Sequence, residues 1–350
     1  MSGHDDYLWT KAGRDREIER LERLLTPYAH RPHGLPPAWR ADRGSPGPRP
    51  ARRARTTLAL AATLAVCALA VTLLLQHRLA WPDGEAWQVL TTTGEVRWQN
   101  GPTPGRLAPG GEIVTGEQGR ARLRVARIGE LWLGADSRLR LEETRSGRHR
   151  VRLLQGRLRA RVWAPPLHFG VRLPGAEALD LGCEFVVESD AAGNGALTVL
   201  SGWVLVDAGA GEVLVPRGAT VPLRRGAGAG TPRDLGASAA FVAALQAIDA
   251  RGGRVPPAGE QVRRLIAASR PQDAISLLTL LQRRPELAQG PLYDRLVQLL
   301  PDAPPVAREA IVRRTPAALD PWWDALPYPR AKRWWLQWPD ALPATGTQSG

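Results

Sequence analysis

The most chemically reactive side chains in this 350-residue chain are two cysteines and six histidines. Cys67 lies inside a long apolar run and Cys183 lies far downstream, so the two are not expected to form a disulfide, and no Cys-x-x-Cys pair is present. No two histidines stand four residues apart, the spacing that would place both on one helix face. The sequence therefore predicts no disulfide framework and no zinc or other metal site.

Two further pairs of residues could suggest catalysis. Asp180 and Glu184 are close in sequence, but strict alternation places both carboxylates on the exposed face of a strand, as solvated surface charge. His168 and Cys183 could form a thiol pair, yet the strand pattern gives no reason for contact. No nucleophile elbow, phosphate loop, dinucleotide-binding or zinc-protease motif is present. We therefore expect a protein that is not an enzyme and has no cofactor.

The basic residues are almost all arginine, since Lys11 and Lys332 are the only lysines in a chain with a formal net charge of +13. A basic balance of this size permits binding to nucleic acid or anionic lipid. Most of the arginines are dispersed and alternate with apolar residues, as on the solvated face of a sheet. The pattern therefore predicts no nucleic-acid partner.

The elements that carry these arginines are predicted to be short strands between about residues 85 and 225. The segment 120–125 places Ala121, Leu123 and Val125 on one face and three arginines on the other, and segments 138–143 and 156–163 alternate in the same way. Glycine-rich turn signals separate these segments. This pattern is typical of an all-β domain, either a sandwich or a short solenoid.

Five segments of this region resemble, in order, the FecR-type domains of ferric-citrate-type sigma-factor regulators. They are "LGADSRLRL" (133–141), "VRLLQGRLRARV" (151–162), "PPLHFGVRLPGAEALDLGCEFVVE" (165–188), "VLSGWVLV" (199–206) and "PRGATVPL" (216–223). The family's "LG-x-x-F-x-V" element is matched by Leu181, Gly182, Phe185 and Val187, with Cys183 where the family usually has Thr. Gly156 and Gly202 match its turn glycines between strands.

The resemblance implies a single-pass regulator whose cytoplasmic end binds a sigma factor and whose exported β domain receives a signal or a partner. Two departures limit what carries over. The N-terminal segment lacks the His-x-x-x-Cys-x-x-Cys pattern of zinc-containing anti-sigma domains, and the C-terminal part does not resemble the small α/β module of iron-siderophore regulators. No specific outer-membrane receptor is therefore expected as a partner.

The run from Thr56 to Leu75 contains no charged residue. Twenty helical residues span about 30 Å, the thickness of the hydrocarbon layer, so we expect a transmembrane helix at 56–76. The run is longer and deeper in the chain than a cleaved signal, and apolar on all sides unlike a buried globular helix. Arginines precede it, at positions 40, 43, 49, 52, 53 and 55. They predict a cytoplasmic N-terminus and a periplasmic C-terminus, at the cytoplasmic (inner) membrane of a bacterium.

Before this run, residues 1–31 form a predicted cytoplasmic helical segment and residues 32–55 a Pro/Arg-rich linker. Ile18, Leu21, Leu24 and Leu25 make one apolar stripe with no core of its own. The stripe either docks a cytoplasmic partner or belongs to a self-packed hairpin or weakly folded tail.

After the predicted β domain (85–225), residues 236–340 show helical periodicity and predict an α-helical bundle. Its tail carries five tryptophans within residues 322–338, namely Trp322, Trp323, Trp334, Trp335 and Trp338. They either complete the helical core or form a surface for a partner, a carbohydrate or a membrane.

The predicted fold class is thus a multi-domain, single-pass membrane protein: a short helical cytoplasmic segment, one transmembrane helix, an all-β exported domain and a helical C-terminal bundle. The predicted function is a membrane-spanning signal-transduction regulator, with a sigma factor or another regulator as the cytoplasmic partner. The alternative is a cell-envelope module that binds or scaffolds an envelope protein or polymer and is anchored by its N-terminal helix, without signalling.

Overall fold

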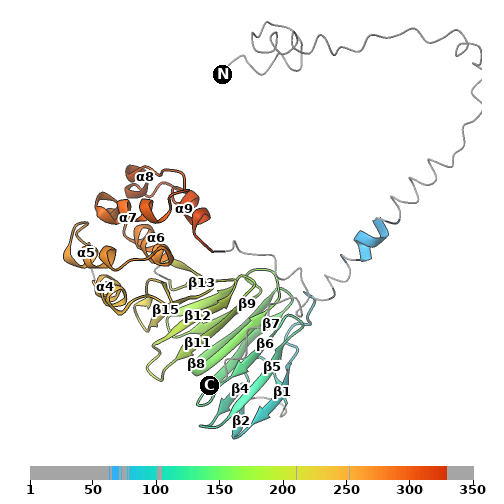
Figure 1. Ribbon diagram of the computed structural model, residues 1–350. Coiled ribbons are helices and arrows are strands. Elements are labelled where there is room, and N and C mark those ends of the chain that lie inside the picture. The colour runs from blue at the N-terminus through green and yellow to red at the C-terminus, as the bar shows by residue number, and fades with distance from the viewer. Residues whose placement is uncertain are drawn as a thin grey trace, which may run out of the picture. The chain divides into compact units, whose positions relative to one another are not determined.

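The computed structural model describes residues 63, 65–70, 72, 77, 79–100, 105–209, 211–251 and 253–328 (Figure 1). The chain divides into two compact units, Met1–Leu69 and Ala70–Gly350. Every strand and helix named below lies in the second unit.

Most of the β strands form two sheets that share one strand, β8 (Arg148–Val162). The first sheet has the order β1 (Trp87–Thr93), β5 (Arg120–Val125), β6 (Gly129–Leu133), β8, β11 (Glu184–Ser189), β12 (Gly195–Ser201), β15 (Ala219–Arg224). The second has the order β2 (Val96–Gln99), β4 (Glu112–Thr115), β7 (Arg138–Arg145), β8, β9 (Phe169–Leu173), β10 (Ala176–Asp180), β13 (Trp203–Asp207), β14 (Glu212–Pro216). Three two-residue strands, β3 (Arg106–Leu107), β16 (Gly228–Ala229) and β17 (Arg233–Asp234), pair at the margins.

The inner faces of both sheets contribute to one hydrophobic core, which contains Leu123, Leu158 and Phe185 from the first sheet and Leu139 and Val171 from the second. The alternation in the sequence predicted this for three segments. Their apolar residues are buried in the structure: Ala121, Leu123, Val125, Leu139, Leu141, Leu158, Ala160 and Val162. The strand predictions for these segments are therefore confirmed.

Strand β8 changes sheets at Gly156. Residues 148–155 pair with β7 and β9 of the second sheet, and residues 156–162 pair with β6 and β11 of the first. Leu153 and Leu158 are both buried although they are five residues apart, because a register shift in the β7–β8 ladder interrupts the alternation between them. Outward-facing side chains thus fall at even positions before the change and at odd positions after it.

Gly156 is the residue that permits this change. Its φ is +95°, and a Cβ placed there would lie 2.1 Å from the Ser137 hydroxyl oxygen. That hydroxyl accepts a hydrogen bond from the Arg157 backbone N–H (2.9 Å) and donates one to the Ala135 carbonyl (2.8 Å). A side chain at position 156 would therefore be strained in conformation and would also displace a bonded serine.

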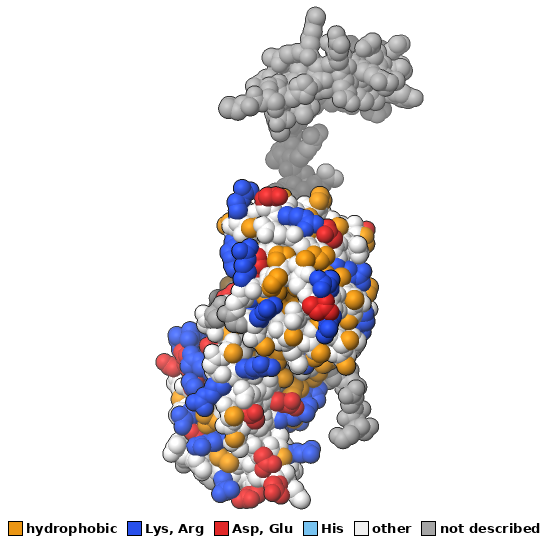
Figure 2. Space-filling model, turned by 90° about the vertical axis from the view of Figure 1, so that its left-hand side faces the viewer, with side chains coloured by type: hydrophobic (Ala, Val, Ile, Leu, Met, Phe, Trp, Pro, Cys, Tyr) orange, Lys and Arg blue, Asp and Glu red, His pale blue; other side chains and the backbone are white. Residues whose placement is uncertain are grey.

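Helices follow the sheets: α4 (Ala239–Asp249), α5 (Glu260–Ala267), α6 (Ala274–Arg283), α7 (Pro291–Leu299), α8 (Arg308–Val312) and α9 (Asp320–Ala325), with short 3₁₀ turns η3 (Pro271–Asp273) and η4 (Pro285–Gln289). They enclose a second hydrophobic core. Polar contacts join them to the end of the β region, where the Asp249 carboxylate accepts from the Thr231 N–H and hydroxyl (2.7 and 2.6 Å). Figure 2 shows basic and acidic side chains interspersed on one side of the molecule, around a patch of hydrophobic ones.

The tryptophan-rich tail is described only in part. Trp322 is 1% exposed, its indole N–H donates to the Pro304 carbonyl (3.0 Å), and its ring packs on Tyr293 at 5.2 Å. Trp323 packs against the same core, whereas Trp334, Trp335 and Trp338 lie outside the described residues. For the first two tryptophans, the structure supports the core alternative.

The predicted fold class of a single-pass membrane protein is wrong. Within the part of the chain that the structure describes, no helix combines the length and the apolar character needed to cross a membrane, and the observed architecture is a large β-sheet domain with helices C-terminal to it. The prediction had a narrow physical basis, because six alanines and four threonines fill half of the run from Thr56 to Leu75 and these contribute little to insertion. Most of the predicted 56–76 helix, and all of segments 1–31 and 32–55, lie outside the described residues.

The role of Gly156 can be tested by comparing Gly156→Ala with Gly218→Ala. Gly218 also has positive φ (+79°), but an added Cβ there would meet nothing within 4 Å. Both substitutions are expected to lose about 1–2 kcal/mol from backbone conformation. Gly156→Ala should lose about 1–3 kcal/mol more from the overlap with Ser137. Urea unfolding gives both values, and equal losses would show that the close contact does not constrain β8.

Candidate functional site

The chain enters the β domain along the hairpin that joins β7 to β8. The Trp81 N–H donates to the Ser146 hydroxyl (2.9 Å), which in turn donates to the Trp81 carbonyl (3.0 Å). The Gly84 N–H donates to the Thr144 carbonyl (2.9 Å). Three hydrogen bonds thus hold the segment before β1 against this hairpin. We call this contact the entry clasp.

A buried relay of three side chains extends the entry clasp into the core. The Trp87 indole N–H donates to the Thr144 hydroxyl oxygen (2.8 Å), which lies 2.8 Å from Nδ1 of His149. All three residues are at most 1% exposed. Since the Thr144 oxygen accepts from Trp87, its own proton is available to Nδ1 of a neutral histidine.

Burial lowers the pKa of His149 to about 4, and the nearby charges of His168 and Arg150 act in the same direction. Burial also lowers the pKa of His168, again with help from Arg150. His149 is therefore neutral near pH 7 and acts as a hydrogen-bond acceptor in this relay.

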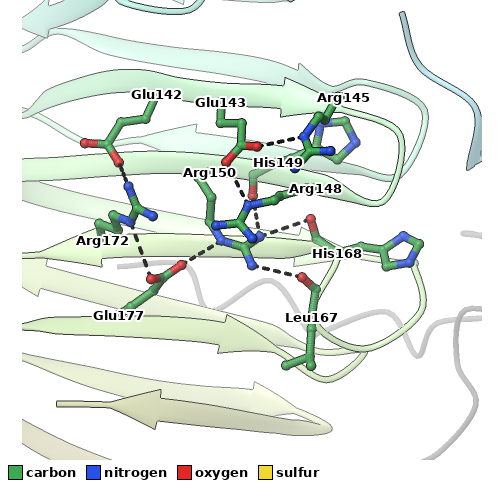
Figure 3. Close-up of polar contacts among 10 residues, drawn as sticks. All are labelled: Glu142, Glu143, Arg145, Arg148, His149, Arg150, Leu167, His168, Arg172 and Glu177. Carbon is green, nitrogen blue, oxygen red and sulfur yellow. Dashed lines mark hydrogen bonds and ion pairs between the residues drawn. The ribbon is translucent and has the colours of Figure 1, made fainter. Parts of the chain in front are cut away.

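Arg150 stands beside His149 on β8, with its guanidinium side chain only 7% exposed. It donates to the carbonyls of His149 (3.0 Å), His168 (3.3 Å) and Leu167 (3.1 Å) and forms an ion pair with Glu177 at 2.6 Å (Figure 3). Burial lowers the pKa of Arg150, while the charge of Glu177 opposes that shift. The cation therefore fixes the loop before β9 against β8.

The charges continue across the outer face of the second sheet as a chain of alternating sign. From Glu177 it passes to Arg172 (3.4 Å), from Arg172 to Glu142 (2.8 Å), and from Glu142 to Arg152. Beside it, Glu143 pairs with Arg145 (2.8 Å) and Arg148 (2.7 Å) at the hairpin of the entry clasp (Figure 3). We call these eight residues the charge ladder: Glu142, Glu143, Arg145, Arg148, Arg150, Arg152, Arg172 and Glu177.

The charge ladder can position strands and present charge, but its groups are poorly suited to proton transfer. Each of its three carboxylates faces arginine, which stays protonated, and the five arginines leave an excess of positive charge. Among the residues that the structure describes, no group of three or more His, Cys, Asp or Glu could hold a metal ion. The arrangement favours recognition of a partner over chemistry.

Asp180 and Glu184 correct the sequence analysis, which placed both on an exposed face. Asp180 is fully buried and accepts from the N–H groups of Gly182 (3.0 Å) and Cys183 (2.9 Å) and from the Cys183 thiol. Glu184 is 2% exposed and pairs with Arg159. The alternation fails here because β10 ends at Asp180 in one sheet and β11 begins at Glu184 in the other. The inward and outward positions of β10 therefore do not predict those of β11.

Burial raises the pKa of Asp180 to about 7, against the lowering effect of its three donors, and it raises the pKa of the Cys183 thiol well above its usual range. The thiol bonds to Asp180 rather than to His168, the partner considered from the sequence. Asp180 thus stabilises the turn between the two sheets through its hydrogen bonds to Gly182 and Cys183.

The residues of the family motif gather around this same turn. Gly182 and Gly202 both have positive φ, and a Cβ on Gly202 would lie 2.3 Å from the Gly182 carbonyl oxygen. Phe185 is fully buried and its ring lies 6.5 Å from that of Phe169. Leu181 is half-buried and its N–H donates to the Trp203 carbonyl (3.2 Å). Gly156, the remaining motif glycine, lies at the sheet change in β8 instead.

The predicted partner-docking residues Ile18, Leu21, Leu24 and Leu25 lie outside the described residues, and their role stays a prediction. The sequence analysis did not identify the Trp87–Thr144–His149 relay or the charge ladder. The only available signal was the run of polar residues in 142–150, for which the sequence analysis made no site prediction.

Comparison with known proteins confirms the family resemblance. Residues 111–205, from the turn before β4 into β13, match the family model described as "FecR protein". Two crystal structures of a "putative anti-sigma factor" from Parabacteroides distasonis ATCC 8503 are similar at 20% identity and a TM-score of 0.32. The matched regions cover 39% of this chain and 63% and 64% of those chains, which is less than two thirds of their length. No curated protein gives a significant match.

The buried histidine predicts an acid-sensitive fold. Since the pKa of His149 is about 4 in the folded chain and about 6.5 in the unfolded one, only the unfolded state takes up this proton between these values. The stabilisation is complete above about pH 6.5 and is lost as the pH falls towards 4, by at most about 1.4 kcal/mol per pH unit. His149→Asn retains an acceptor near Nδ1 but does not titrate. Its difference from wild type in unfolding free energy should change over this range, and a constant difference would contradict the assignment.

Asp180 predicts the opposite slope. Its pKa of about 7 in the folded chain exceeds the ordinary value of 3.8, so the folded state keeps a proton that the unfolded state releases. This stabilisation is complete below about pH 3.8 and is lost as the pH rises towards 7. Relative to Asp180→Asn, the wild type should therefore weaken from pH 4 to 7 in urea unfolding. A difference that stays constant over this range would show that the carboxylate is already ionised in the folded chain.

Proposed function

We propose that the protein regulates a sigma factor, with its FecR domain receiving the regulatory partner and its N-terminal segment acting on the sigma factor. The observation that carries the proposal is the FecR match over residues 111–205. FecR-type domains belong, in the resemblance drawn from the sequence, to regulators of sigma factors. The name given to the Parabacteroides protein is of the same kind.

The entry clasp supports a connection between the two ends of such a regulator. The segment that leads from the N-terminus into β1 is held by the β7–β8 hairpin, through Ser146 and Thr144. That hairpin also carries Glu143, Arg145 and Arg148 of the charge ladder. A partner bound to this outer face would contact the hairpin that holds the N-terminal connection.

A binding or scaffold module without signalling is the second candidate. It is favoured by the charge ladder, because ion pairs hold its exposed arginines on the outer face and the buried Arg150 guanidinium fixes the backbone beneath them. A rigid surface of this kind can bind a partner without changing its own conformation.

An interaction test with the full chain distinguishes the sigma-factor regulator from the scaffold module. We expect the chain to bind one sigma factor of its source organism in a two-hybrid or co-purification assay. Leu21→Asp combined with Leu24→Asp should abolish that binding, because both lie on the predicted apolar stripe. The matched control is Glu19→Gln with Glu22→Gln on the opposite side, which should leave binding intact. If the chain binds no sigma factor, or if deletion of residues 1–35 leaves target promoter output unchanged, the scaffold candidate replaces this one.

A further inference from the structure

The outer face of the first sheet carries six arginines on two strands. Three lie on β5 (Arg120, Arg122, Arg124) and three on β8 after the sheet change (Arg157, Arg159, Arg161), with β6 between the two strands. We call these six residues the arginine face. It is distinct from the charge ladder, which lies on the second sheet.

The pairing of β5, β6 and β8 places the side chains of the arginine face in rows across the sheet. Trp132 on β6 lies opposite Arg122 on one side and Arg159 on the other, and both guanidinium carbons lie over its indole, at 5.4 and 5.5 Å. In the next row, Glu130 lies opposite Arg124 and Arg161. The Trp132 indole therefore holds the guanidinium groups of Arg122 and Arg159 in place, and its own ring can also contact a ligand.

Acidic residues balance only part of this charge. Glu130 pairs with Arg122, Glu184 with Arg159, and Glu188 with Arg157 (2.9 Å). Six cations against three carboxylates leave an excess of three positive charges on the face. The three ion pairs also limit the arginine rotamers, which reduces the entropy lost when an anion binds.

A groove of about 800 Å³ follows these rows at the β1 side of the sheet. Four arginines line it, namely Arg120, Arg122, Arg157 and Arg159, together with Trp132, and no acidic residue lines it. Thr91 and Thr93 of β1 also line it. Three of these arginines pair with carboxylates that lie outside the lining, so the groove presents guanidinium groups and hydroxyl groups but no acid of its own.

The spacing of the arginines selects the shape of a ligand. Alternate residues of a strand lie about 6.6 Å apart and the columns on β5 and β8, two strands apart, about 9.6 Å. Alternate side chains of an extended peptide repeat at the same 6.6 Å or so. A carboxylate can accept two parallel hydrogen bonds from one guanidinium, which a point charge such as an ammonium does not offer.

We propose that this groove binds an acidic segment of a partner protein in extended conformation, with Asp or Glu at alternate positions facing the arginines. Charge complementarity argues for an anionic partner, and the strand-like spacing argues for an extended peptide. The proposal does not depend on the sigma-factor role, since it concerns a surface of the β domain.

The first test uses fluorescence anisotropy of the full chain with a labelled peptide of about twelve residues alternating Glu and Ser, long enough to pass three arginines in one column. We expect binding that weakens as salt rises. Arg120→Gln with Arg157→Gln should weaken it about tenfold or more, since each lost charge-assisted hydrogen bond contributes of the order of a tenfold factor. Both side chains are exposed, so the fold should be unaffected.

The matched control is Arg217→Gln with Arg225→Gln, which removes the same charge from exposed positions at the two ends of β15, outside the groove lining, and should leave binding unchanged. Equal weakening by both double variants would overturn the site in favour of nonspecific attraction. A peptide of the same composition, with all Glu residues in one half and all Ser residues in the other, should bind more weakly than the alternating peptide. Equal binding of the two peptides would overturn the spacing argument. Tighter binding of duplex DNA or of anionic vesicles than of the peptide would overturn the choice of partner.

A second readout does not depend on affinity. An anion that draws Arg122 or Arg159 away from Trp132 should change the indole emission. Peptide titration should therefore alter the tryptophan fluorescence of the wild type but not that of Trp132→Phe. The same change in both proteins would place the peptide away from this groove.

Discussion

The β domain depends on one constraint, namely that β8 serves both sheets and must change from one to the other at Gly156. The change alters which residues of β8 face outwards: Arg150 and Arg152 before it, Arg157 and Arg159 after it. Without the interruption of the alternation at 153–156, the later arginines would point into the core in place of Leu158 and Ala160. The register shift between Leu153 and Gln155 thus decides which residues enter the common core and which form the two cationic outer faces, and Gly156, where a side chain would overlap Ser137, directly follows it.

The many arginines are explained largely by the carboxylates they accompany. The side chain of Glu112 is fully buried; burial tends to raise its pKa, but hydrogen bonds and charge from Arg138 and Arg140 lower it overall. Leaving a buried carboxylate unpaired would cost several kcal/mol, so such pairs are a requirement of the fold. The basic composition therefore reflects sheet surfaces, in agreement with the dispersed pattern in the sequence. On the charge ladder and on the arginine face alike, the arginines outnumber the carboxylates.

Sequence patterns predicted the parts of the fold in which alternation is continuous, such as Ala121, Leu123 and Val125. They failed where the chain passes from one sheet to the other, and Asp180 and Glu184 were assigned to solvent because alternation was extended through a turn. The His149 relay could not be predicted, since it joins residues more than fifty positions apart on three strands. The family motif succeeded because its glycines mark close backbone contacts, as between Gly182 and Gly202, that admit few substitutions.

Strand β8 also gives physical continuity between the two outer faces, since it carries Arg159 of the arginine face and His149 beside the entry clasp. Continuity alone is not a switch, because coupling requires an element with two arrangements. Strand β8 is paired on both edges and its apolar side chains are buried, so it is a poor candidate for that element. The segment at Trp81 is a better one, because its clasp consists of a few hydrogen bonds at the protein surface. Its inner end is fixed by the buried Trp87, so release would stop at β1 and leave the core intact.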